Sequence, residues 1–235
     1  MEAFHNDHLI KEKYLTRLNE HYQADEIIQG QYWENGKGCA VGCTIHSGNY
    51  KNYELGLGIP TCLAYVEDPI FKGLPNKLAK EFPLQFLSSI KVGANLSEVS
   101  KLFTIWLLTD IEYGVLQYVD DKKVIQDIAD AFAQDMVSPV LEEEWKKLRK
   151  IAYAASYSSS SYSAAATAYY AAASASDFVA YYYYSYSAAA YSAAAAYCVS
   201  TDSAAYCHSN LNKNSKSEWY IGASKKLIEL LKNAN

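Results

Sequence analysis

Apolar side chains recur at helical spacing through most of the first 150 residues and again near the C-terminus. In residues 7–29, Leu, Ile and Tyr fall near helical spacing, and the pattern stops at Gly30. The same spacing predicts further helices over residues 60–66, 76–90, 97–109, 121–136, 139–155 and 218–232. Since no run of alternating polar and apolar residues requires a strand, the pattern predicts an all-α fold. A short hairpin inside the Gly-rich residues 30–58 is the main risk to this prediction.

The segment 152–207 has a composition unlike the rest of the chain. Of its 56 residues, 47 are Ala, Ser or Tyr. Neither Gly nor Pro occurs from Val140 to Ile221, and Ala is the best helix former, so we expect several close-packed helices. Clusters rich in Ser predict the breaks between them, with an aspartate at a helix start. These clusters are Ser158–Ser161, Ser174–Asp177 and Ser200–Ser203, and the capping residues are Asp177 and Asp202.

Charge divides the chain at the same place. Residues 1–150 carry 16 basic and 22 acidic side chains, whereas residues 151–235 carry 5 and 4. We therefore expect a helical N-terminal region over 1–150 and an Ala/Ser/Tyr-rich helical region over 151–235. Packed together, they would form one multi-helix, bundle-like body.

Consecutive tyrosines predict self-association. Tyr181–Tyr184 point in all directions around a helix, so that helix cannot have one wet face and one dry face. Monomers rarely expose a large aromatic patch, and Tyr is enriched at interfaces. We expect a homo-oligomer, most simply a symmetric dimer, through Tyr181, Tyr183, Tyr184 and Tyr191.

Overall charge and cysteine content narrow the functional classes. A net charge of −5 without basic clusters argues against a nucleic-acid partner. No apolar run is long enough for a transmembrane span, and the N-terminus lacks the features of a signal peptide. Five cysteines in 235 residues indicate a reducing compartment, so we expect a cytoplasmic location, without a membrane partner or a cofactor.

The candidate site lies in a Gly-rich segment, residues 30–58, which contains seven of the 11 glycines. A short helix over Gly38–His46 would place Cys39, Cys43 and His46 on one face. Gly38 and Gly42, four residues apart beside them, would allow another backbone to come close. Three interpretations stay open: buried core residues, a catalytic thiol activated by His46, or a metal site. The metal site would need Glu54, Cys62 or another His, and because the spacing matches no familiar zinc motif we expect no metal.

The same segment has features of an anion site. Lys37 and the backbone N–H groups of residues 36–39 could hold a phosphate, and flanking aromatic rings could stack on a base or sugar. An acidic pair before Pro69 reads either as a helix end or as a contact to ligand hydroxyls. The predicted ligand-binding residues are Trp33, Lys37, Gly38, His46, Tyr50, Glu54, Glu67 and Asp68.

Three stretches carry a resemblance: GKGCAVGCTIH, YELGLGIPTCLAYVEDPIFKGLPN and FLSSIKVGANLSEV. They resemble an uncharacterised family of bacterial and phage proteins that joins such a block to an Ala-rich helical tract. Here the tract carries Ser and Tyr where the family has more charged residues and Trp. The family has no established activity, so the resemblance implies no catalytic residues. It implies a bacterial or phage origin and a ligand or partner role, such as sequestering a signalling nucleotide of the host.

Together these patterns predict a non-enzymatic protein that binds a small, phosphorylated or nucleotide-like ligand. One alternative is an enzyme with Cys39 or Cys43 as nucleophile and His46 as base. Another is a structural module for self-assembly. The incomplete catalytic set favours binding.

Overall fold

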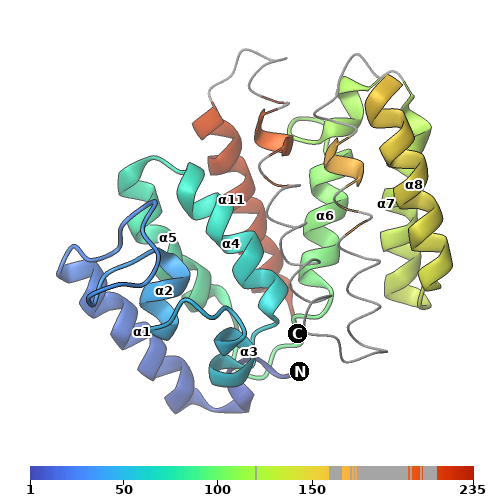
Figure 1. The fold of residues 1–235 in the computed structure, drawn as a ribbon. Helices are drawn as coiled ribbons and strands as arrows, with labels where there is room; N and C mark the ends of the chain where they lie inside the picture. The colour runs from blue at the N-terminus through green and yellow to red at the C-terminus, as the bar shows by residue number, and fades with distance from the viewer. Residues whose placement is uncertain are drawn as a thin grey trace. The chain divides into compact units, whose positions relative to one another are not determined.

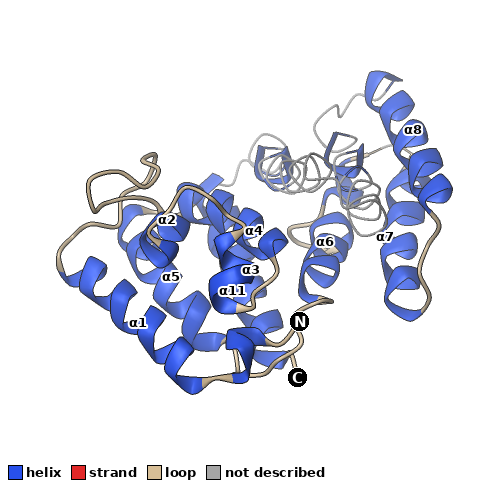
Figure 2. Ribbon diagram, turned by 60° about the horizontal axis from the view of Figure 1, so that its bottom comes forward, coloured by secondary structure: helices blue, strands red, loops and turns tan. Residues whose placement is uncertain are grey.

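The computed structural model describes residues 1–119, 121–158, 166–169, 171, 173, 201, 203–206, 208 and 216–235. In this part of the chain the elements are helices and no strand forms (Figure 2), which confirms the predicted all-α class. Contacts divide the chain into two compact units, Met1–Ser100 with Tyr220–Asn235 and Lys101–Trp219. This division follows contacts and not composition, so the domain boundary at residue 150 stays a prediction.

The first unit is built around two helix pairs. Helix α1 (His8–Gln23) lies along α5 (Asn76–Ser89) and α2 (Ala40–Ile45), and α4 (Thr61–Gly73) packs against α5 and α2 (Figure 1). Their facing side chains form an aromatic and aliphatic core, which includes Phe4, Leu18, Leu63, Phe71, Phe82, Phe86 and Leu87. In chain order, the elements that begin in this unit are η1 (Ala3–Asn6), α1 (His8–Gln23), α2 (Ala40–Ile45), α3 (Asn52–Leu57), α4 (Thr61–Gly73), α5 (Asn76–Ser89) and α6 (Val99–Thr109).

The second unit contains most of α6, followed by η2 (Val115–Tyr118), α7 (Lys122–Val137) and α8 (Glu142–Ser158). The Asp121 side chain accepts a hydrogen bond from the Lys123 N–H and caps α7. Between α7 and α8 the rings of Phe132 and Trp145 lie 4.8 Å apart. Helix α11 (Lys216–Asn233) begins in this unit and continues in the first.

Helix α1 ends six residues earlier than the apolar spacing predicts. Asp25 adopts a left-handed conformation with φ 57°, which stops the helix. The chain then runs beside Gly38, whose N–H donates to the Glu26 carbonyl and whose carbonyl accepts from the Ile28 N–H. This pairing of residues far apart in sequence determines where the Gly-rich segment lies.

Helix α4 corrects the interpretation of Glu67 and Asp68 as a helix end. The helix continues through Pro69 to Gly73, and both acidic residues are buried in its interior. Pro69 has no backbone N–H, so it cannot donate the helical hydrogen bond to the carbonyl of Tyr65. The residues around it are almost entirely buried, so tertiary packing maintains the helix beyond this point.

The Gly-rich segment is only partly a loop. Asn35 and Gly36, with φ 52° and 79°, form a tight turn in which Glu34 and Lys37 exchange backbone hydrogen bonds. The predicted short helix is present as α2, whereas α3 was not predicted. In the Ala/Ser/Tyr-rich tract, the described residues 166–169 and 203–206 are helical. The predictions for Tyr181, Tyr183, Tyr184, Tyr191, Asp177 and Asp202 lie outside the described residues.

Candidate functional site

Helix α2 has Cys39 at its start, Cys43 in its interior and His46 at its end. Cys39 is the N-cap, and its Sγ accepts a hydrogen bond of 3.4 Å from the Gly42 N–H. His46 is the C-cap in a left-handed conformation, with φ 51°. The cysteines are buried and His46 is exposed, so the helix separates the thiols from the imidazole.

The thiols are held within the protein. The Cys43 Sγ donates to the carbonyl oxygens of Gly38 at 3.3 Å and Glu26 at 3.6 Å. Burial raises the pKa of the Cys43 thiol to about 12 and also raises the pKa of Cys39. Neither has His46 as a hydrogen-bond partner, so each thiol stays protonated near neutral pH.

Gly38, just before α2, and Gly42 within it allow Trp33 to lie directly against the helix. A Cβ on Gly38 would lie 2.9 Å from the Tyr32 carbonyl oxygen, and one on Gly42 would lie 3.1 Å from the Trp33 Cβ. The close approach predicted from the glycine spacing is therefore present, and Trp33 makes it. The Trp33 ring stacks on His46 with centroids 4.5 Å apart and planes inclined by 10°.

A chain of hydrogen bonds runs inward from His46. Its Nε2 lies 2.7 Å from the Nε2 of His21, a nearly buried residue of α1. The Nδ1 of His21 lies 2.7 Å from a carboxylate oxygen of Glu26. A carboxylate that accepts from one ring nitrogen determines which nitrogen of that ring carries the proton. The arrangement Glu26–His21–His46 therefore couples an exposed imidazole through a buried one to a half-buried carboxylate.

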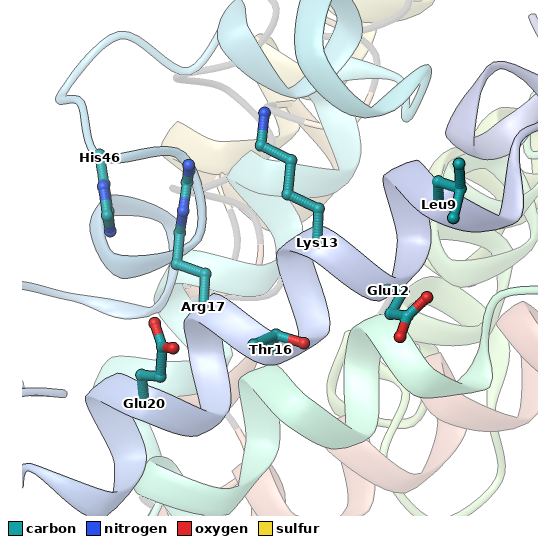
Figure 3. Close-up of a pocket in the computed structure, with 7 residues that line it drawn as sticks. All are labelled: Leu9, Glu12, Lys13, Thr16, Arg17, Glu20 and His46. Atoms are coloured by element: carbon teal, nitrogen blue, oxygen red, sulfur yellow. The ribbon is translucent and has the colours of Figure 1, made fainter.

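His46 forms one wall of a groove along α1 (Figure 3). The groove has a volume of about 490 Å³, which falls in the range of small-molecule sites. The side chain of Arg17 extends beside His46, with Lys13 one turn further along the helix. Its lining residues are Leu9, Glu12, Lys13, Thr16, Arg17, Glu20 and His46.

Arg17 is held in place before any ligand arrives. Its Nη1 donates to the Thr44 carbonyl at 2.9 Å, and its guanidinium lies 5.0 Å from the centre of the Tyr14 ring. A guanidinium has five N–H donors, so this contact leaves others for a ligand. Partial burial of the His46 ring lowers its pKa, and the positive charge of Arg17 lowers it further.

A second polar cluster is buried between α2, α3 and α4. The Tyr53 hydroxyl donates to a Glu67 oxygen at 2.5 Å, and Lys72 pairs with Asp68 at 2.5 Å. Burial, and then the nearby Asp68, raise the pKa of the Tyr50 hydroxyl. Burial raises the pKa of Glu67 to about 8, so this carboxyl is mostly protonated at neutral pH.

The structure brings the predicted ligand residues together in two groups. Trp33 and His46 adjoin the groove, with Gly38 directly beneath Trp33. The buried cluster contains Tyr50, Glu67 and Asp68.

Two predicted residues belong to neither group. The Glu54 carboxylate accepts a hydrogen bond of 3.0 Å from the Thr61 N–H at the start of α4. Lys37 is exposed on the tight turn and does not line the groove.

Sequence reasoning missed Arg17, His21 and Glu26. A sequence signal exists for two of them, because Arg17 and His21 are four residues apart and share a face of α1. Their pairing with the end of α2 depends on the tertiary fold.

Within the described residues, no group of three or more His, Cys, Asp or Glu side chains could hold a metal ion. No helix in the same part of the chain is long and apolar enough to cross a membrane. Comparison of the chain with protein-family models, with curated proteins and with solved structures found no match.

Proposed function

We propose that the protein binds a small phosphorylated molecule in the α1 groove and holds it without converting it. The observation that carries this proposal is the fixed position of Arg17 between Lys13 and His46. Since the Thr44 carbonyl and the Tyr14 ring already orient the guanidinium, little side-chain entropy is lost when it contacts an anion. Arginine matches the geometry of phosphate oxygens through paired N–H donors.

The other lining residues support a nucleotide-like ligand. Glu12 and Glu20 line the same groove as Lys13 and Arg17. Carboxylates accept hydrogen bonds, so they suit the hydroxyl or amino groups of a sugar or base and not a second phosphate. A ligand with one anionic end and several donors satisfies both kinds of side chain.

The chemistry of the thiols favours binding over the thiol-enzyme alternative. A cysteine nucleophile acts as a thiolate, next to a base that takes its proton. Burial raises the pKa of both Cys39 and Cys43, and the imidazole of His46 contacts His21 instead. The self-assembly alternative depends on tyrosines outside the described residues.

The biological setting belongs to the same proposal. The resemblance to a bacterial and phage family suits a cytoplasmic protein that sequesters a nucleotide-like ligand of the cell or infected host. Self-association through the Tyr-rich helix would then display several copies of the groove.

Thermal unfolding and calorimetry with inorganic phosphate and a panel of nucleotides test this proposal. We expect at least one phosphorylated compound to stabilise the protein without turnover. Replacing Arg17 with Ala should weaken its binding by about 10-fold to 100-fold, the scale of hydrogen bonds to a charged group. Arg17→Lys, which keeps the charge but loses the planar fork, should recover part of the affinity.

Lys37→Ala is the comparison variant, because the sequence predicts that Lys37 contacts the anion. A ligand on the turn would lose about 1–2 kcal/mol with this change, whereas a ligand in the groove loses almost nothing. If Lys37→Ala weakens ligand binding and the Arg17 variants bind as tightly as wild type, the groove is not the binding site. Failure of every phosphorylated compound to bind would overturn the function itself.

A further inference from the structure

We infer that the groove takes up one proton together with a dianionic ligand, through the hydrogen-bonded chain from Glu26 through His21 to His46. This inference rests on the proposed function and states how the groove would recognise the charge of the phosphate. The ligand would carry a phosphate dianion, and the imidazole of His46 would donate a hydrogen bond to it. The evidence is the two contacts of 2.7 Å that join Glu26 to His21 and His21 to His46.

The hydrogen bonds determine how many protons the free site holds. The Glu26 carboxylate accepts from Nδ1 of His21, so that nitrogen carries a proton. With both rings neutral, the Nε2 of His21 is then an acceptor. The contact of 2.7 Å between the two Nε2 atoms holds one proton, which must come from His46.

This proton count leaves the Nδ1 of His46 as a bare lone pair. Its Nε2 faces His21, and Nδ1 has no hydrogen-bond partner among the described residues. A lone pair repels an anion. In the free protein, the neutral imidazole therefore offers no hydrogen-bond donor to an anion bound beside Arg17.

Adding one proton completes the site without breaking any contact. Nδ1 of His46 becomes a donor to the ligand, Nε2 still donates to His21, and His21 still donates to Glu26. The same count holds if the charge resides on His21, because its Nε2 then donates to the Nε2 of His46 and the proton of His46 lies on Nδ1. A second added proton would place one N–H against another at 2.7 Å, so uptake stops at one.

The charged groups around His46 make the uptake depend on the ligand. Arg17, Glu20 and His21 face His46 from α1, and Glu26 faces it from the segment after this helix. Lys13 and Glu12 lie further along the groove. Burial, then Arg17 and His21, lower the pKa of His46 in the free protein. A dianion bound to Arg17 reverses the sign of the nearest charge, which favours the protonated ring. Trp33 stacks on this ring and stabilises a cation there.

The test uses sodium sulfate, a dianion that does not titrate near neutral pH. Calorimetry in two buffers with different ionisation enthalpies measures the protons taken up on binding. We expect close to one proton per bound sulfate in the full-length protein at slightly alkaline pH. The affinity should then fall by about tenfold per pH unit above the pKa of His46 in the free protein.

Two variants separate this inference from its alternatives. His46→Asn, which suits the left-handed C-cap position, should bind sulfate more weakly, with no proton uptake and a flat pH profile. Glu26→Gln should move the pH profile to lower values, because the carboxylate charge that favours the protonated pair is gone. Sulfate binding that needs Arg17 but takes up no proton overturns the inference and leaves the proposed function standing. Absence of sulfate binding, or sulfate binding unaffected by Arg17→Ala, overturns the inference, whereas the proposed function falls only if no phosphorylated compound binds.

Discussion

The indole of Trp33 lies parallel to the imidazole of His46, with ring centroids 4.5 Å apart. The backbone of Trp33 reaches this position because Gly38 and Gly42 present no side chain to it. The same imidazole is hydrogen-bonded to His21. Two small residues on α2 therefore determine how an exposed histidine in the groove is oriented.

Gly38→Ala should disturb this arrangement. The added Cβ would lie 2.9 Å from the Tyr32 carbonyl and 3.0 Å from the Trp33 Cα, both backbone atoms that cannot rotate away. We expect a loss of about 1–3 kcal/mol in the free energy of unfolding, measured by urea titration, and a change in tryptophan fluorescence. Gly48→Ala, at an exposed glycine with nothing within 4 Å, is the matched control and should change neither. Equal stability of the two variants would show that the contact with α2 is not tight.

Self-association is predicted from the sequence alone, since the tyrosines concerned lie outside the described residues. Light scattering at micromolar concentration should report a mass above the 26.2 kDa of one chain, most simply twice that value. Tyr183→Lys or Tyr184→Lys should split the oligomer or cause aggregation, because a charge cannot be buried in an aromatic interface without a partner. A monomeric unmodified protein would contradict this prediction.

The helices that the sequence predicts well have strong local signals. Helices α7, α8 and α11 each lie within three residues of the expected bounds, because apolar spacing and, for α7, the Asp121 cap act locally. The end of α1 was missed since Asp25 is not a strong helix-stopping residue by type. At Pro69 the local sequence predicts the end of a helix, but α4 continues to Gly73 because burial of the surrounding residues maintains it.

The candidate site shows the same limit. The spacing of Gly38 and Gly42 predicts that a backbone approaches α2, but not which one, since that depends on the pairing of residues 26–28 with Gly38. The contact between His21 and His46 joins two helices across 25 residues, and no local pattern predicts it. The acidic pair of α4 is recognised from its position before Pro69, but its burial is a property of the fold.

Glu67 should make the protein less stable as the pH rises. Its pKa of about 8 in the fold lies above the unfolded value of 4.5, so the fold keeps a proton that the unfolded chain releases between these values. The stabilisation is complete below pH 4.5 and is lost toward pH 8, by at most about 1.4 kcal/mol per pH unit. Glu67→Gln keeps an acceptor for the Tyr53 hydroxyl and should remove this part of the slope in urea titrations across that range. Glu34→Gln, on the exposed turn, is the control that should leave the slope in place, and an equal slope in wild type and Glu67→Gln would show that Glu67 is ionised in the fold.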